Sequence, residues 1–131
     1  MKNAYQDAHQ QYKNIDLHSR VEAASPHELI SLLFQGARAH IASAVGSMER
    51  KEIAAKGEHI GKTISIIGEL RSVLDLEKGG EIAANLAGLY EYMQTILTKA
   101  NLNNDASLLQ EANNLLTQIH QAWLDMPLTS N

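Results

Sequence analysis

The sequence predicts an all-α protein, folded as an antiparallel up-down four-helix bundle with a short N-terminal cap segment that is helical or extended. Hydrophobic residues make up 44% of its 131 residues but aromatic residues only 5%, and it has two prolines, which favours helices over strands. Apolar residues recur at three- and four-residue steps in four segments. Since the connections between these segments are short, consecutive helices should run antiparallel.

The first predicted helix covers residues 26–49. Ser25 at the N-cap, Pro26 at the first helical position and Glu28 at the place of a capping-box carboxylate mark its start. Its apolar positions are Leu29, Ile30, Leu33, Phe34, Ala37, Ile41, Ala44, Val45 and Met48. The cap segment of residues 1–24 precedes this helix.

The second predicted helix covers residues 51–76 and ends where Gly79 and Gly80 can supply a positive φ. Its main apolar positions are Ile53, Ile60, Ile64, Ile67, Leu70, Val73 and Leu74. The third helix is predicted over residues 81–102. It carries apolar residues at Ile82, Leu86, Leu89, Tyr90, Met93, Ile96 and Leu97.

The fourth predicted helix covers residues 105–124, with Asp105 as its N-cap, and it stops before Pro127. Its apolar positions are Leu108, Leu109, Ala112, Leu115, Leu116, Ile119 and Trp123. The bundle is therefore expected to occupy residues 25–126 as one domain, followed by a short tail of residues 127–131.

Composition excludes several classes of function. The chain has no cysteine, which rules out disulfides, thiolate zinc sites and thiol catalysis. Its net charge of −4 comes from dispersed residues, and basic residues never cluster beyond Arg50-Lys51, so nucleic acid is not an expected partner. Neither a secretory signal nor a run of roughly 18 apolar residues is recognisable, so we expect a cytoplasmic protein without membrane insertion.

Familiar catalytic and metal-binding patterns are incomplete. Gly61-Lys62-Thr63 looks like the end of a phosphate-binding loop, but Lys56 stands where that motif needs a glycine, and helical periodicity continues through the segment. None of the six histidines follows a glutamate by three residues, as in di-iron bundles, and no two are four residues apart. We therefore expect that the protein binds no metal and no cofactor, and that it is a binding protein and not an enzyme.

Two alternatives stay open. In His59-Ile60-Gly61-Lys62 a histidine and a lysine have the spacing of histidine phosphotransfer domains, which are also four-helix bundles. However, Thr63 stands where those domains usually have glycine, and His59 falls within the apolar arc of its helix. The second alternative is a generic adaptor bundle without a specialised site.

The helix predicted over residues 51–76 has an apolar arc of about 180°, wider than the stripe of somewhat over 100° that a bundle interior usually covers. Either the helix contacts two neighbours, or it offers an apolar groove to a partner segment. The N-terminal segment bears on this choice. Its Tyr5, Ala8, Tyr12 and Ile15 form an amphipathic pattern that is too short to be stable as an isolated helix.

A series of short motifs runs along the chain. In order they are Tyr12-x-x-Ile15, Ala24-Ser25-Pro26-His27-Glu28-Leu29-Ile30, Leu33-Phe34-Gln35-Gly36-Ala37, Leu74-Asp75-Leu76-Glu77-Lys78-Gly79-Gly80-Glu81, Leu89-Tyr90-Glu91-Tyr92-Met93, Ala100-Asn101 and Ala122-Trp123. Their joint order and spacing over about 110 residues resembles the flagellar secretion chaperone family FliS. One departure is Gln35, where the family commonly carries aspartate.

This resemblance implies a cytoplasmic export chaperone. Such a protein binds the disordered C-terminal segment of flagellin, prevents its premature polymerisation and presents it to the export gate of the flagellar type III apparatus. The resemblance also implies that the client wraps around a helical bundle, and that the N-terminal segment can cover the bundle until the client binds. The same apolar surface could also pair two chains into a homodimer.

Candidate partner-binding residues follow from the resemblance and the helical wheels together. We expect the shield of the groove to consist of Tyr5, Tyr12 and Ile15. The candidate walls are Ile60, Ile64 and Ile67 from the second predicted helix and Leu86, Tyr90, Met93 and Leu97 from the third. For Leu86, Met93 and Leu97, a plain core position is the competing interpretation.

Overall fold

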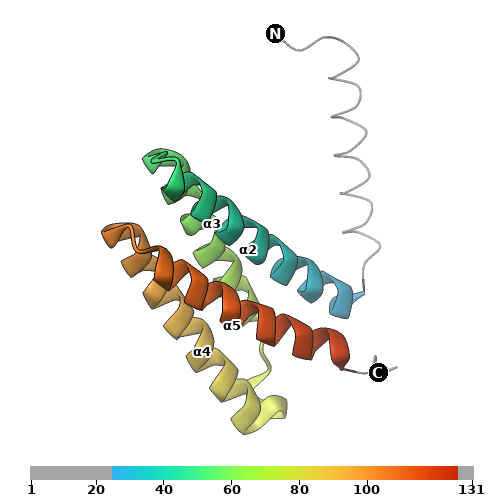
Figure 1. The fold of residues 1–131 in the computed structure, drawn as a ribbon. Helices are drawn as coiled ribbons and strands as arrows, with labels where there is room; N and C mark the ends of the chain where they lie inside the picture. The colour runs from blue at the N-terminus through green and yellow to red at the C-terminus, as the bar shows by residue number, and fades with distance from the viewer. Residues whose placement is uncertain (1–24, 127–131) are drawn as a thin grey trace, which may run out of the picture.

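The computed structural model describes residues 25–126 and arranges them in four α-helices, without a strand in that range (Figure 1). The helices are α2 (Pro26–Glu49), α3 (Ile53–Ser72), α4 (Leu76–Asn103) and α5 (Ala106–Asp125). Both α2 and α4 pack against α3 and α5, so the four helices close a ring around one core. The predicted all-α bundle is confirmed. The expected cap segment and tail, residues 1–24 and 127–131, lie outside the described residues.

The two helix starts predicted from capping residues have the expected hydrogen bonds. At α2, the Ser25 hydroxyl accepts a hydrogen bond from the backbone N–H of Glu28 at 3.2 Å, and Pro26 occupies the first turn. At α5, the Asp105 carboxylate accepts one from the backbone N–H of Ser107 at 3.0 Å. Each side chain thus satisfies one of the free N–H groups that every helix N-terminus leaves.

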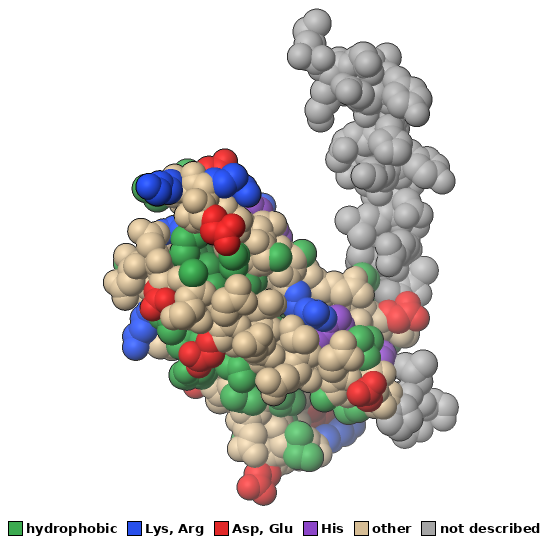
Figure 2. Space-filling model, viewed as in Figure 1, with side chains coloured by type: hydrophobic (Ala, Val, Ile, Leu, Met, Phe, Trp, Pro, Cys, Tyr) green, Lys and Arg blue, Asp and Glu red, His purple; other side chains and the backbone are tan. Residues whose placement is uncertain are grey.

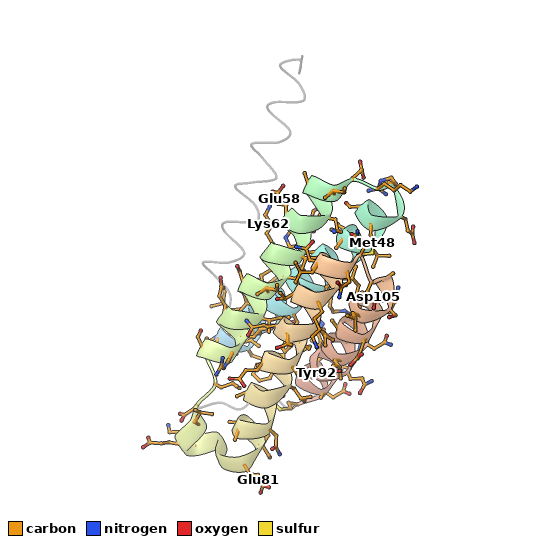
Figure 3. All side chains as sticks on the ribbon, turned by 90° about the vertical axis from the view of Figure 1, so that its left-hand side faces the viewer. Met48, Glu58, Lys62, Glu81, Tyr92 and Asp105 are labelled. Carbon is orange, nitrogen blue, oxygen red and sulfur yellow. The ribbon has the colours of Figure 1, made fainter. Side chains whose placement is uncertain are left out.

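The connection between α3 and α4 differs from the prediction. The third helix of the bundle begins at Leu76, earlier than expected, because the Asp75 carboxylate accepts a hydrogen bond from Lys78 N at 3.0 Å and caps a short first turn. Gly80 then adopts φ 53° and ψ −129°, which breaks the regular helical geometry. Residues with a Cβ rarely adopt this conformation. The glycine therefore kinks α4, and the kinked end projects beside Glu81 in Figure 3.

The core draws large apolar residues from all four helices and alanines from α2, α4 and α5. Its members are Phe34, Ala37, Ile41, Ala44, Ile60, Ile67, Leu70, Tyr90, Met93, Ile96, Leu97, Ala100, Leu109, Ala112 and Leu116. Their side chains interlock along the length of the bundle, and their removal from water supplies the main driving force for folding.

A buried lysine joins α3 to the end of α4. The side chain of Lys56 is 4% exposed, and its Nζ donates hydrogen bonds to the backbone carbonyl of Asn101 at 3.0 Å and to the side-chain oxygen of Asn104. Asn104 itself has a left-handed backbone conformation that ends α4. The ammonium group thus satisfies a carbonyl of the last turn, where the helix dipole also favours a cation.

Candidate partner-binding groove

An apolar groove of about 710 Å³ opens where the kinked start of α4 faces α2 and the end of α5. Its lining residues are Ile30, Phe34, Leu70, Val73, Leu74, Asp75, Lys78, Gly79, Ile82, Ala83, Leu86, Tyr90, Gln118, Ile119, Ala122, Trp123 and Met126. Most are apolar, and Ile82 at its mouth is 74% exposed. A groove of this size suits several side chains of a partner.

The groove exists because α4 does not run straight to its N-terminus. On the N-terminal side of the kink at Gly80, Val73 and Asp75 belong to the short connection between the end of α3 and the first turn of α4. The apolar residues facing α5 at this end, Ile82 and Leu86, are therefore not fully covered by neighbouring helices. Exposed apolar surface of this kind marks an interaction site more often than a random surface position does.

Tryptophan and histidine fix the edge of the groove. The indole Nε1 of Trp123 donates a hydrogen bond to the backbone carbonyl of His27 at 3.1 Å, and His27 Nε2 donates one to the carbonyl of Trp123 at 3.2 Å. The two rings stack with centroids 4.6 Å apart and planes 16° apart. This reciprocal pair holds the last turn of α5 against the first turn of α2, so the edge does not need to be ordered when a partner binds.

The floor of the groove rests on a buried histidine. Phe34 lines the groove and stacks on His120, with ring centroids 5.1 Å apart. The Arg38 guanidinium donates a hydrogen bond to His120 Nδ1 at 3.0 Å; because arginine has no acceptor, this nitrogen must be unprotonated. His120 Nε2 then carries the proton and donates it to the Ser31 hydroxyl at 3.1 Å. Burial, and to a lesser extent the Arg38 charge, lower the pKa of His120, which keeps the ring neutral.

Charges near the groove are sparse and mixed in sign. Asp75 and Lys78 lie at its rim with opposite charges, and the rest of the lining is uncharged. Figure 2 shows basic and acidic side chains interspersed over the face formed by α2, α4 and α5, without a basic cluster. The groove therefore selects a partner by apolar contact rather than by charge.

The structure places the predicted binding residues in three different settings. Leu86 and Tyr90 line the groove. The others in the described range are core residues or pack against the core: Ile60, Ile64, Ile67, Met93 and Leu97. Tyr5, Tyr12 and Ile15 lie outside the described residues.

Sequence reasoning did not assign several groove residues to a site. Ile30 and Phe34 looked like plain core positions, as did Ile119 and Trp123. A usable signal was present, because the Gly79-Gly80 pair lies immediately before Ile82. Apolar residues beside a glycine pair at the start of a helix are positions that the bundle core reaches poorly.

Comparison with known proteins shows the family. The model of the family described as "Flagellar protein FliS" matches residues 8–129. The chain belongs to the FliS family.

The relatives of this FliS-family chain cover most of its length. It is 49% identical over 116 residues to the flagellar secretion chaperone FliSB of Pseudomonas aeruginosa, and the aligned region spans 88% of this chain and 92% of that protein. It is 46% identical over 113 residues to flagellar secretion chaperone FliS of Salmonella typhimurium, spanning 86% and 84%. The same comparison with FliS of Bacillus subtilis gives 32% over 103 residues, spanning 79% and 76%. The family supports a role as a flagellar export chaperone.

The FliS family is a chaperone family, so no catalytic activity is expected of this chain. His59, the residue of the phosphotransfer alternative, is half-buried, and its Nδ1 lies 3.0 Å from Nδ1 of His40 on α2. One of these nitrogens therefore donates a hydrogen bond to the other. Burial, then the charges of His59 and Lys62, lower the pKa of His40. This pair links α2 to α3.

The described residues offer no group of three or more histidine, aspartate or glutamate side chains that could hold a metal ion. Within the same part of the chain, no helix is long and apolar enough to cross a membrane. The groove, by contrast, has a mainly apolar lining that a partner could cover.

Proposed function

We propose that this chain is an export chaperone for flagellin, which binds the disordered C-terminal segment of flagellin in the groove between α2, α4 and α5. The observation that carries the proposal is an apolar groove with a prebuilt edge and floor on a chain of the FliS family. By covering the segment, the chaperone prevents premature polymerisation in the cytoplasm, and it then delivers flagellin to the flagellar type III export gate.

Burial of apolar surface accounts for the expected strength of binding. Each square ångström of apolar surface removed from water contributes roughly 25 cal/mol, whereas ordering a disordered client costs several kcal/mol. Because Trp123 and His27 already hold the groove edge, little further ordering of the chaperone is needed. A large contact surface with moderate net affinity follows, which suits a cargo that must later be released.

The N-terminal segment is proposed as a removable cover of the same surface. In this part of the proposal, Tyr5, Tyr12 and Ile15 shield apolar residues until flagellin displaces them. The chain order supports it, because the segment joins α2 at Ser25, only a few residues before the groove residue Ile30. A free chain without this cover could instead pair with a second copy through the exposed groove.

Binding to matched flagellins tests the main proposal. Purified chain is mixed with monomeric flagellin, or with flagellin that lacks its C-terminal segment, and complexes are separated by size-exclusion chromatography. Full-length flagellin should form a complex with the chain and polymerise more slowly in its presence. The truncated protein should form no complex, and the chain should not slow its polymerisation. Absence of a complex with full-length flagellin, or equal binding of the truncated form, would overturn the proposal.

Deletion of the first fifteen residues tests the cover. The bundle should unfold at the same temperature as the parent, because the deleted residues precede α2, while the affinity for the flagellin segment should change as a competitor is removed. Equal affinity of the deleted and full-length chains would show that the segment does not cover the binding surface.

A further inference from the structure

Tyr90 presents a polar group at the buried base of an otherwise apolar groove. Its side chain is only 3% exposed and belongs to the core cluster, yet it also lines the groove together with Leu86 and Phe34. The other polar lining side chains, Asp75, Lys78 and Gln118, are exposed at the rim. Tyr90 is therefore the most buried of the residues with a polar side chain that line the groove.

This hydroxyl has no hydrogen-bond partner among residues 25–126, whereas the hydroxyl of Tyr92, two positions along α4, donates to the Glu111 carboxylate. Every fully buried side-chain nitrogen or oxygen of the described residues does have a partner. The Tyr90 oxygen is therefore not sealed inside the core, and the groove is the open space that this residue lines.

Tyr90 acts as a hydrogen-bond donor over the whole physiological pH range. Burial of the ring raises the pKa of Tyr90 to about 12, so the hydroxyl keeps its proton. The indole N–H of Trp123, the other donor in the lining with an aromatic ring, is already bound to the His27 carbonyl. A donor without an internal partner at the base of an apolar groove is suited to an acceptor brought by a ligand.

We propose that the Tyr90 hydroxyl donates a hydrogen bond to an acceptor oxygen of the segment that docks in the groove, and that this bond sets the register of that segment. The acceptor is a side-chain hydroxyl or amide oxygen, or a backbone carbonyl that is free of helical hydrogen bonds. A purely apolar segment would leave the phenol without a partner in a desolvated place, which weakens its binding relative to a segment with the acceptor. This inference rests on the proposed function, because flagellin supplies the segment.

Two matched substitutions on α4 test the role of the hydroxyl. Tyr90→Phe removes the oxygen at the groove and keeps the ring, and Tyr92→Phe removes a hydroxyl that is bound to Glu111 outside the groove. The measurement is the dissociation constant of the full chain for a fluorescently labelled C-terminal flagellin peptide. Tyr90→Phe should weaken binding about three- to tenfold, as expected for one hydrogen bond, and Tyr92→Phe should leave it unchanged.

Thermal unfolding of the free chain provides a readout that does not depend on flagellin. Because the Tyr90 hydroxyl has no internal partner among the described residues, Tyr90→Phe should melt at or above the temperature of the parent. A lowered melting temperature would indicate an internal partner and would overturn the inference. Equal affinity of the parent and Tyr90→Phe for the peptide would overturn it while leaving the proposed function intact. A parent chain that binds no peptide would contradict the proposed function itself.

A double-mutant cycle identifies the acceptor. Serine, threonine, asparagine and glutamine residues of the peptide are replaced one at a time by alanine, and each peptide is titrated into the parent and into Tyr90→Phe. Replacement of the peptide residue that accepts the bond should weaken binding to the parent but not to the variant. If every replacement weakens binding to the parent and the variant equally, and the variant keeps the parent affinity for the unaltered peptide, the hydroxyl makes no bond to the client.

Discussion

Replacing Ile82 by aspartate tests where the client docks. Ile82 lines the groove and is 74% exposed, so an aspartate there remains in water in the free chain and costs the fold little. It also lies close to the start of the regular part of α4, where the helix dipole tolerates a negative charge. The bundle of an Ile82→Asp variant should therefore stay folded while its groove loses affinity.

The size of the effect follows from the exposed area that a client would cover. Complete burial of an isoleucine side chain is worth about 1.5–3 kcal/mol, and three quarters of this side chain is still available, which gives about 1–2 kcal/mol. Desolvation of the new carboxylate adds at least about 1 kcal/mol. Binding of the flagellin segment should weaken by about 2–3 kcal/mol in total, or roughly 30- to 160-fold.

Leu102 is a matched control on the same helix. It is 76% exposed, lies near the C-terminal end of α4 and does not line the groove. That end of the bundle carries Asp105 and Met48 in Figure 3, opposite the end with Glu81. Fluorescence anisotropy of a labelled C-terminal flagellin peptide measures both variants. Similar affinities of Ile82→Asp and Leu102→Asp would refute docking in this groove.

Three further predictions concern the bundle that supports the groove. Because the folded-state pKa values of His120 and His40 lie below the usual 6.5, the unfolded chain binds more protons than the folded chain as the pH falls. The stability that the two neutral histidines contribute is therefore fully present above about pH 6.5 and is lost at lower pH. Melting temperatures should drop from about pH 7 to about pH 5, and less steeply in His120→Gln. Lys56→Met removes two hydrogen bonds of a buried cation and should lower the free energy of unfolding by about 2–4 kcal/mol in urea titrations, whereas exposed Lys99→Met should change it by less than about 0.5 kcal/mol. Gly80→Ala should cost about 1–2 kcal/mol in the same assay through backbone strain alone, because no atom lies within 4 Å of the added Cβ.

Different outcomes would contradict each of these predictions. A melting temperature that does not change between about pH 7 and pH 5 would show that the two histidines do not titrate with folding. Equal stabilities of the two lysine variants would show that the buried ammonium group contributes nothing at the end of α4. An alanine variant at Gly80 as stable as the parent would show that the positive φ is not retained.

The sequence predicts helix starts well where an N-cap side chain hydrogen-bonds to the backbone of the first helical turn. Ser25 and Asp105 are N-caps predicted from the sequence, and both accept the backbone hydrogen bonds that define a cap. The predicted start of the third helix at residue 81 is later than the observed start of α4, because Asp75 caps a turn of only a few residues before the kink at Gly80. The sequence shows that a glycine can take a positive φ there, but it does not say whether the chain then ends a helix or bends one.

The groove was harder to predict, since it depends on which helix covers which face. The wide apolar arc of α3 reflects contact with two neighbours: α2 and α4 both pack against α3, and Ile60 and Ile67 are buried. A helical wheel gives the direction of a side chain but not the neighbour that it meets. Leu86 and Tyr90 reach the groove because α4 kinks below them, which is a tertiary consequence of Gly80.

The fluorescence of Trp123 offers the most direct test of docking in the groove. It is the only tryptophan of the chain and it lines the groove, so a tryptophan-free C-terminal flagellin peptide that docks there must alter its surroundings. We expect its emission to change and to saturate at one peptide per chain, and Ile82→Asp to shift this titration to higher peptide concentration. Unchanged emission while calorimetry records binding, or no binding by either method, would contradict the assignment of the groove as the flagellin site.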